Sequence, residues 1–227
     1  MGRWQGVFLD FYGTVASGDV LAVESACQQV IDDHGLDLAA SDLAVQWGHC
    51  YFAAIEAVDG QGFRLLRQIE HDTLVETVLP LVGRIDARPY VEQLNAYLLR
   101  PTLFEEVPGI LERLALPVCI VSNADDRELQ GALKHHRLQF NYVVSSESAR
   151  SYKPDRRIFE TALELTGWSP DHVVHVGDSL HSDVEGAHRA GIQAAWVCRA
   201  QRIGDIGTAR PDFTWSDLRL LLRLQAD

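Results

Sequence analysis

Polar side chains follow several short apolar runs of this sequence, each at the point where the run stops. The runs and the polar residues that end them are 7–9 with Asp10, 118–121 with Ser122, and 173–177 with Asp178. Short apolar runs of this kind are typical of buried strands. Ligands of parallel α/β sheets bind beyond the carboxyl ends of the strands. We therefore expect these side chains to meet at one edge of a sheet.

The residue types at these positions suit phosphoryl transfer. Two carboxylates from different strands, Asp10 and Asp178, can hold one Mg²⁺ ion, and a carboxylate such as Asp10 can also attack phosphorus. Lys153 and the Ser122 hydroxyl would offset charge on the phosphoryl oxygens. A neighbouring lysine is also expected to lower the pKa of Asp10 and keep it ionised. Each residue alone reads as a cap, a turn or a solvated side chain, so only the combination favours this chemistry.

The pattern of apolar residues predicts the elements that must position this set. Residues 17–100 show helical periodicity without an intervening strand, which predicts an inserted helical subdomain of four helices. Residues 1–16 and 101–227 are expected to form the α/β core, because strands and helices alternate there. We expect strands at 118–121, 142–144, 173–176 and 194–197, and helices at 108–114, 127–136, 154–165, 183–190 and from Ser216 onward.

Four ordered motifs resemble those of the haloacid dehalogenase superfamily, and the resemblance covers the whole chain. The motifs are Asp10-Phe11-Tyr12-Gly13-Thr14, Val121-Ser122-Asn123, Tyr152-Lys153-Pro154-Asp155 and Gly177-Asp178-Ser179-Leu180-His181-Ser182-Asp183. The resemblance implies a Rossmann-like, doubly wound parallel sheet, with residues 17–100 similar to the family's α-helical (type 1) cap. It therefore implies a hydrolase.

The same resemblance implies a role for each motif residue. Asp10 would be the nucleophile and a Mg²⁺ ligand, with the Tyr12 carbonyl and Asp178 as further ligands and Asp183 acting through water or from an outer shell. Lys153 would tie Asp10 to the substrate, and Ser122 would bind phosphate. The residues expected to bind the substrate are Tyr12, Thr14, Ser122, Asn123 and Lys153.

Position 12 departs from the phosphatase pattern. Phosphatases of this superfamily usually carry a second Asp there, as the acid and base of the reaction, whereas this chain has Tyr12. A phenol with a pKa of about 10 is a poor base near neutrality, and a well-matched acid or base is worth roughly 10²–10⁴ in rate. A small-molecule phosphatase would then favour acyl phosphates, phosphonoaldehydes, or a substrate that brings its own acid.

Two alternatives stay open. The superfamily's 2-haloacid dehalogenases typically read Asp-x-Tyr-Gly-Thr and use no metal; Asp10 would then form an ester with the substrate carbon, and Asp183 would assist its hydrolysis. Dehalogenases generally lack the carboxylate that this chain keeps at Asp178, so the last motif favours the metal. The third possibility is a phosphate- or metal-binding protein with negligible turnover.

The composition of the chain disfavours two classes of partner and leaves a small-molecule substrate as the expected one. A net charge of −12 disfavours nucleic acid and anionic membrane surfaces, which both attract basic proteins. No apolar stretch approaches the roughly 20 residues that span a bilayer. The four cysteines are widely spaced and the amino terminus lacks a signal-peptide pattern, so we expect a cytoplasmic protein without disulfides. The sequence predicts no oligomeric state.

Three further polar residues have competing interpretations. His175 alternates with valines inside a predicted strand, which favours a hydrogen-bonded packing role, whereas His181 is the candidate to replace the missing acid. Asp125 precedes a predicted helix and is expected to cap it.

Overall fold

The structure is a computed structural model that describes residues 3–58, 62–199 and 207–225, and it divides into two compact units. Unit 1 comprises Met1–Ser17, Thr102–Asn123 and Leu138–Asp227, and unit 2 comprises Gly18–Pro101 with Ala124–Arg137. The assignment of residues 17–100 to a cap and of the rest to a hydrolase core stays a prediction. The segment Ala124–Arg137 groups with unit 2, although its sequence pattern continues the alternation of the core.

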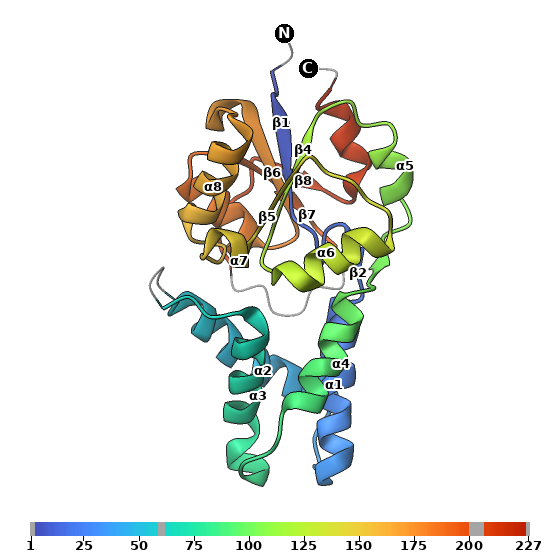
Figure 1. Ribbon diagram of the computed structural model, residues 1–227, viewed down its shortest axis with the longest axis vertical. Coiled ribbons are helices and arrows are strands. Elements are labelled where there is room, and N and C mark those ends of the chain that lie inside the picture. Colours follow the sequence, from blue (N-terminus) through green and yellow to red (C-terminus); the bar gives the residue numbers. More distant parts are fainter. Residues whose placement is uncertain (1–2, 59–61, 200–206, 226–227) are drawn as a thin grey trace. The chain divides into compact units, whose positions relative to one another are not determined.

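Unit 1 is built on a six-stranded parallel sheet with the strand order β5-β4-β1-β6-β7-β8 (Figure 1). The strands are β1 (Gly6–Leu9), β4 (Val118–Ser122), β5 (Tyr142–Ser145), β6 (Val173–Gly177), β7 (Gln193–Val197) and β8 (Phe213–Trp215). Strands β1 and β6 are buried from end to end, as continuous apolar runs in a parallel sheet require. The predicted parallel α/β fold is confirmed, whereas β8 was not predicted because it has only three residues.

The register of the sheet brings the polar strand ends together. Leu9 of β1 pairs with Ile120 of β4 on one side and with Val176 of β6 on the other. The next residue, Asp10, continues this pairing, since its backbone N–H donates to the carbonyl of Val176 at 2.9 Å. The carboxyl ends of three adjacent strands therefore lie at one edge.

Helices cover both faces of this sheet, with α8 (Arg156–Thr166) on one side and α5 (Val107–Leu111) on the other (Figure 1). On the α8 face, Phe8 and Val121 of the sheet form one buried cluster with Ile158 and Phe159 of the helix. The remaining short helices are α7 (Ser146–Ala149), η1 (Pro170–His172) and α9 (Gly186–Arg189). Burial of such apolar faces is the dominant favourable term in folding.

Two of the predicted α-helices have a different helix type in the structure. The helix expected at 183–190 begins as a π-helix, η2 (Leu180–Glu185), before α9. The carboxyl-terminal helix is a short 3₁₀ segment, η3 (Leu218–Arg223), not an α-helix. The buried leucines Leu218, Leu221 and Leu224 recur every third residue. A spacing of three matches the 3₁₀ helix, in which side chains at i and i+3 eclipse.

A small antiparallel pair joins the points where the chain leaves and re-enters unit 1. Strands β2 (Ala16–Ser17) and β3 (Thr102–Leu103) pair through Ser17 and Thr102. Each has only two residues, so no periodic pattern could predict them.

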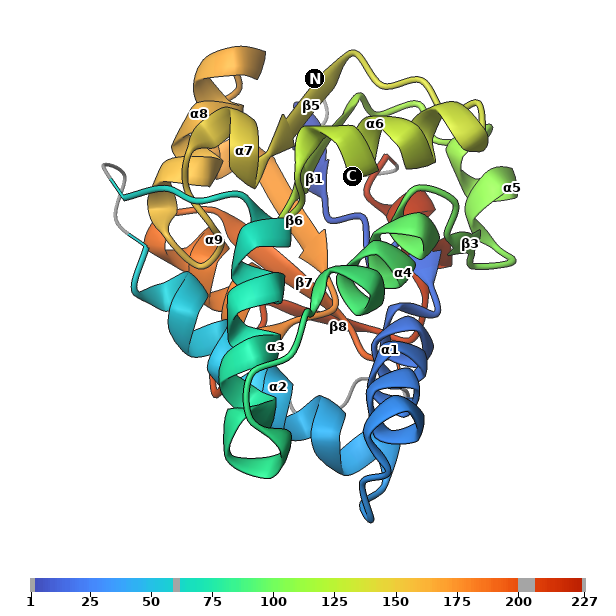
Figure 2. The ribbon, with the colours of Figure 1, turned by 60° about the horizontal axis from the view of Figure 1, so that its bottom comes forward.

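Unit 2 is helical, with α1 (Asp19–His34), α2 (Ala40–Glu56), α3 (Leu66–Val82), α4 (Arg88–Leu98) and α6 (Asp126–His135). Figure 2 shows α1 beside α4 and α2 beside α3, and both pairs are in contact. Residues of α1, α2, α3 and α4 form one buried cluster that includes Val30, Trp47, Leu74 and Tyr90. The helices predicted here are confirmed. Of the helices in the described residues, none is both long and apolar enough to cross a membrane.

Candidate active site

Asp10 is buried immediately after β1, and only 4% of its surface is exposed. One carboxylate oxygen accepts a hydrogen bond from the Lys153 ammonium at 2.6 Å. The other accepts from the Thr14 hydroxyl at 2.9 Å, and the same hydroxyl lies 3.4 Å from an oxygen of Asp178. Asp10 is thus held in place at both oxygens, and Thr14 stands between two carboxylates.

Gly13 lets the turn after Asp10 approach Asp178. Its φ is +86°, which disfavours side chains, and a Cβ there would lie 2.5 Å from a carboxylate oxygen of Asp178. Glycine therefore brings the first and the last motif into contact.

Lys153 joins the first motif to the last. Its ammonium contacts Asp10 and Asp183 at 2.6 Å each, and all three side chains are buried. The Lys153 backbone is fixed by Asn123, whose amide accepts from the Lys153 N–H at 2.7 Å and donates to its carbonyl at 3.1 Å. The structure therefore uses the Asn123 side chain to hold the lysine loop, while its expected role in substrate binding stays a prediction.

Three donors converge on Asp183. One oxygen accepts from Lys153 and from the His175 Nε2 at 2.9 Å, and the other accepts from the Ser179 N–H at 2.9 Å. A Cβ on Gly177 would lie 2.1 Å from the Asp183 carboxyl carbon, so the strand end must be glycine for Asp183 to fit. Of these partners, the backbone N–H of Ser179 is one that residue types cannot predict.

The pKa values of these groups follow from burial and from the Lys153 charge. Burial raises the pKa of Asp183, but the Lys153 and His175 contacts outweigh it and hold that pKa well below its usual range. For Asp10, burial is the larger effect, and the pKa is raised although Lys153 acts to lower it. Lys153 thus acts on the pKa of Asp10 in the expected direction, but burial and the nearby Asp183 charge oppose it and the net shift is upward. Burial alone would lower the pKa of Lys153, yet the two carboxylates raise it.

Asp10, Asp178 and Asp183 form a cluster that suits a divalent cation. Each is buried and offers an oxygen within 4.8 Å of the oxygens of the other two. Carboxylate oxygens are the ligands that Mg²⁺ prefers. Three buried carboxylates and the single charge of Lys153 leave an excess of negative charge, which is costly unless a cation offsets it.

The remaining predicted residues have less defined roles. The Ser122 side chain is buried at the end of β4, on the strand next to β1, and so lies at the same edge as Asp10. Tyr12 is half-buried with its ring against Phe11. His175 is fully buried and hydrogen-bonded as expected. His181 pairs with Glu185 at 2.9 Å, so the ring nitrogen that makes this contact is not turned toward Asp10.

Comparisons with known proteins agree with this geometry. The family model described as haloacid dehalogenase-like hydrolase matches residues 4–191. An (S)-2-haloacid dehalogenase of Pseudomonas sp. (strain YL) is 26% identical over 97% of this chain and 94% of its own length. A phosphoserine phosphatase of Thermus thermophilus is 39% identical over 50% of this chain and 44% of its own length.

The fold also matches that of a solved structure over nearly the whole chain. The structure of the L-2-haloacid dehalogenase from Xanthobacter autotrophicus has a TM-score of 0.80 and 22% identity, with 98% of each chain covered. The dehalogenase likeness and the phosphatase likeness thus coexist in one chain, as they do in its motifs. Both kinds of relative are hydrolases, and the chain belongs to the haloacid dehalogenase-like hydrolase family.

Proposed function

We propose that this hydrolase acts on small phosphorylated molecules with the help of Mg²⁺ and uses Asp10 as its nucleophile. The observation that carries the proposal is the buried cluster of Asp10, Asp178 and Asp183, whose oxygens lie within 4.8 Å of one another. A metal-free dehalogenase has no use for the Asp178 carboxylate beside its nucleophile, because the like charge would oppose ionisation of Asp10.

Each residue of the site would have its own role in the proposed reaction. An Asp10 oxygen forms a bond to phosphorus while the bond to the leaving oxygen breaks, and water then hydrolyses the aspartyl phosphate. Lys153, fixed on both Asp10 and Asp183, would balance charge on the phosphoryl group, and the Ser122 hydroxyl would hold a phosphoryl oxygen. Asp10, Asp178 and the Tyr12 carbonyl would hold Mg²⁺, with Asp183 nearby, and the ion would supply further charge neutralisation.

Tyr12 restricts the substrate. It is a poor base for activating water and a weaker acid than a carboxyl group toward the leaving oxygen, because the pKa of a phenol lies far above neutrality. We therefore expect acyl phosphates and other substrates with good leaving groups to react faster than alkyl monophosphates. Four free cysteines suit the reducing cytoplasm that the sequence predicts.

A second candidate is a 2-haloacid dehalogenase. Tyr12 favours it, as does the (S)-2-haloacid dehalogenase that is 26% identical over nearly the whole chain. Halide leaves without a proton, so Asp10 would attack carbon and form an ester that water cleaves. In this case Asp178 would have no role in the reaction.

The test is product release from a panel that runs from alkyl monophosphates through acetyl phosphate to 2-chloropropionate, with Mg²⁺ and with EDTA. We expect Mg²⁺-dependent phosphate release that is fastest for acetyl phosphate and absent in Asp10→Asn. Halide release that EDTA leaves unchanged would establish the dehalogenase instead. No turnover of any substrate would leave a protein that only binds phosphate or metal.

A further inference from the structure

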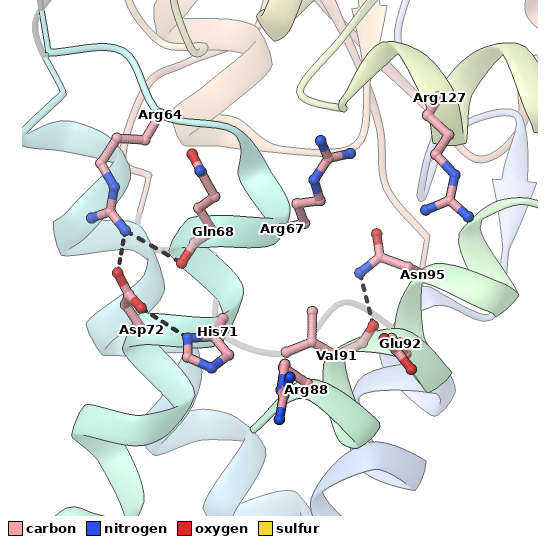
Figure 3. A pocket seen from close by; sticks show the side chains of 10 residues that line it. All are labelled: Arg64, Arg67, Gln68, His71, Asp72, Arg88, Val91, Glu92, Asn95 and Arg127. Carbon is pink, nitrogen blue, oxygen red and sulfur yellow. Dashed lines mark hydrogen bonds and ion pairs between the residues drawn. The ribbon is translucent and has the colours of Figure 1, made fainter. Parts of the chain in front are cut away.

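Unit 2 contains an arginine-lined pocket of about 620 Å³ that the proposed reaction does not use. It lies among the segment before α3, α3 itself, α4 and α6, and its lining residues are Arg64, Arg67, Gln68, His71, Asp72, Arg88, Val91, Glu92, Asn95 and Arg127 (Figure 3). Four arginines face two carboxylates there, although the whole chain carries a net charge of −12. Pockets of this size accommodate small organic ligands.

Two of the four arginines are already engaged. Arg64 forms an ion pair with Asp72, and Arg88 binds Asp86 through two side-chain hydrogen bonds of 2.8 and 2.6 Å. Their charges are thus balanced within the protein, so they are poor candidates for holding a ligand.

The other two arginines are not engaged in this way. Within the described residues, no hydrogen bond or ion pair occupies the Arg67 guanidinium, which projects into the pocket from α3 in Figure 3. The Arg127 side chain of α6 is 66% exposed and forms a long ion pair with Glu128 at 3.6 Å, which is beyond hydrogen-bonding distance. Gln68 accepts from the Leu65 N–H through its amide oxygen, which leaves its amide nitrogen to donate.

Burial also shifts the pKa values of two acidic side chains of unit 2, Glu128 and Glu70. Burial raises the pKa of Glu128, whose two oxygens lack hydrogen-bond partners among the described residues. Burial likewise raises the pKa of Glu70 to about 8, so that it is largely neutral at pH 7. Asp125 accepts from the N–H groups of Leu66 and Arg67 at 2.7 and 3.2 Å. Asp125 occupies the N-cap position of α6 as expected, but its side chain caps α3 instead.

We propose that this pocket binds a small organic oxyanion, held by the guanidinium groups of Arg67 and Arg127 with the Gln68 amide as a third donor. Planar guanidinium groups match phosphate and carboxylate oxygens in paired, charge-assisted hydrogen bonds. The donors are carried by helices α3 and α6, whose mutual position is fixed by the Asp125 cap.

The test is isothermal titration calorimetry with inorganic phosphate and with malonate, in EDTA, on the full chain. The Arg67→Gln and Arg127→Gln variants should each weaken binding at least about tenfold, because each removes a charge-assisted hydrogen bond; tenfold corresponds to about 1.4 kcal/mol. The matched control is Arg88→Gln, which removes the same charge from the pocket but an arginine already paired with Asp86; it should change affinity less than about twofold. The stronger of the two probes identifies the anionic group.

Three outcomes would overturn the proposal. The first is that neither probe binds. The second is that all three arginine variants weaken binding equally, which would mean that only net charge matters. The third is that binding is lost in Ser122→Ala and kept in Arg67→Gln, which would place the anion at the candidate active site. None of these readouts depends on hydrolase activity, so the proposed function and this site can fail separately.

A second inference rests on different residues, His175 and its partners in unit 1. His175 is fully buried, its Nε2 lies 2.9 Å from Asp183, and its ring meets Phe159 edge-on at a centroid distance of 4.9 Å. The Nδ1 atom has no hydrogen-bond partner in the described part of the chain. The hydrogen-bond network therefore assigns the proton to Nε2, which donates to Asp183.

The geometry points to His175 as a positioning residue that orients Asp183, which in turn holds Lys153 against Asp10. Asp183 and Asp10 compete for one ammonium at equal distances of 2.6 Å, so rotation of the Asp183 carboxylate would change the position of the lysine. The Nε2 hydrogen bond and the Ser179 N–H fix the two oxygens of Asp183 against this rotation.

Two amide variants separate the hydrogen bond from packing. His175→Gln places an NH₂ group near the position of Nε2, whereas His175→Asn places it near Nδ1. On any substrate turned over, which rests on the proposed function, we expect His175→Asn to lower kcat about 10- to 100-fold at nearly constant KM. We expect His175→Gln to retain most of the wild-type kcat.

Crystal structures of both variants give a readout that needs no activity. The contact between Lys153 and Asp183 should persist in His175→Gln and lengthen or break in His175→Asn. Equal geometry in both variants, or equal losses of kcat that track thermal stability, would contradict the positioning role and leave His175 a packing residue.

Discussion

Unit 1 and unit 2 each bury carboxyl groups, and the pKa values of Asp183 and Glu70 are shifted in opposite directions. Asp183 in unit 1 contacts the Lys153 ammonium, the His175 ring and a backbone N–H, and its pKa is held low. Glu70 in unit 2 is equally buried, its oxygen accepts from the neutral Asn95 amide, and its pKa is raised to about 8. Burial alone favours the neutral acid, so the pKa of a buried carboxyl group stays low only where its partners outweigh burial, as they do at Asp183 and not at Asp10.

The opposite pKa shifts distinguish the candidate active site of unit 1 from the buried Glu70 among the helices of unit 2. A buried ion pair is weak support for stability, because desolvation offsets its attraction. Unit 1 nevertheless keeps Asp10, Asp178 and Asp183 together. Under the proposed function, these carboxylates would hold Mg²⁺ beside the Asp10 nucleophile, which would explain why they are kept despite this cost.

The largest expected effect is that of Asp10→Asn, which keeps the shape of the nucleophile and removes its charge. We expect kcat to fall by about 10⁴-fold or more, as when a nucleophile that acts as part of a unit is removed. The variant should still fold, because Lys153 keeps its contact with Asp183. Turnover assays combined with circular dichroism check both expectations, and a variant that stays active would show that Asp10 is not the nucleophile.

The next effect is that of Lys153→Met, which leaves Asp10 and Asp183 without the lysine charge, as Glu70 is without a cation in the part of the chain that the structure describes. We expect a loss of about 3–5 kcal/mol in the free energy of unfolding at pH 7, because two buried carboxylates lose their cation. The loss should shrink in the double variant with Asp183→Asn. Urea denaturation measures it, and equal stability of wild type and Lys153→Met would mean that the pair contributes little.

A smaller effect of opposite sign is expected for Glu70→Gln. The folded chain holds the Glu70 proton up to about pH 8, whereas the unfolded chain releases it near 4.5, so the free energy of unfolding falls as pH rises between these values. The variant removes this loss, so it should match the wild type at pH 4.5 and exceed it by roughly 1–3 kcal/mol at pH 8.5. Urea denaturation at both pH values tests this, and a gain at pH 4.5 only would reverse the sign.

The smallest effect is expected for Asn123→Ala, which breaks two hydrogen bonds to the Lys153 backbone but leaves the ion pairs. We expect a loss of about 1–2 kcal/mol in stability and a decrease of several-fold in kcat. Thermal unfolding and steady-state kinetics provide the measurement. A loss as large as that of Lys153→Met would show that the loop, rather than the charge, holds the site together.

The sequence predicts the parallel sheet and the gathering of its polar strand ends because both depend on local signals. Apolar runs mark buried strands, and parallel pairing then forces Asp10, Ser122 and Asp178 to one edge. The contacts of Asp183 with His175 and the Ser179 backbone were not predicted. They depend on a π-helical turn whose dihedral angles leave no mark in residue type.

The arginine pocket of unit 2 was not predicted either, because it depends on contacts between residues that are distant in the sequence. Arg67 and Arg127 are 60 residues apart and meet because Asp125 caps a helix distant in sequence, whereas its local pattern predicts that it caps the helix following it. The sequence likewise predicts that Lys153 acts to lower the pKa of Asp10, but not that burial of Asp10 outweighs the lysine, because burial is not visible in residue types.

The most direct test of the proposed metal-dependent chemistry is Mg²⁺ binding by isothermal titration calorimetry. We expect one Mg²⁺ per chain, with affinity at least about 100-fold weaker in Asp178→Asn, because a ligand and the charge that requires the cation are both lost. Glu70→Gln is the matched control, since it neutralises a buried carboxyl group in the other unit, and its affinity should equal that of the wild type. Wild-type protein that binds no Mg²⁺, or Asp178→Asn that binds it equally well, would contradict the metal-dependent mechanism and favour the dehalogenase.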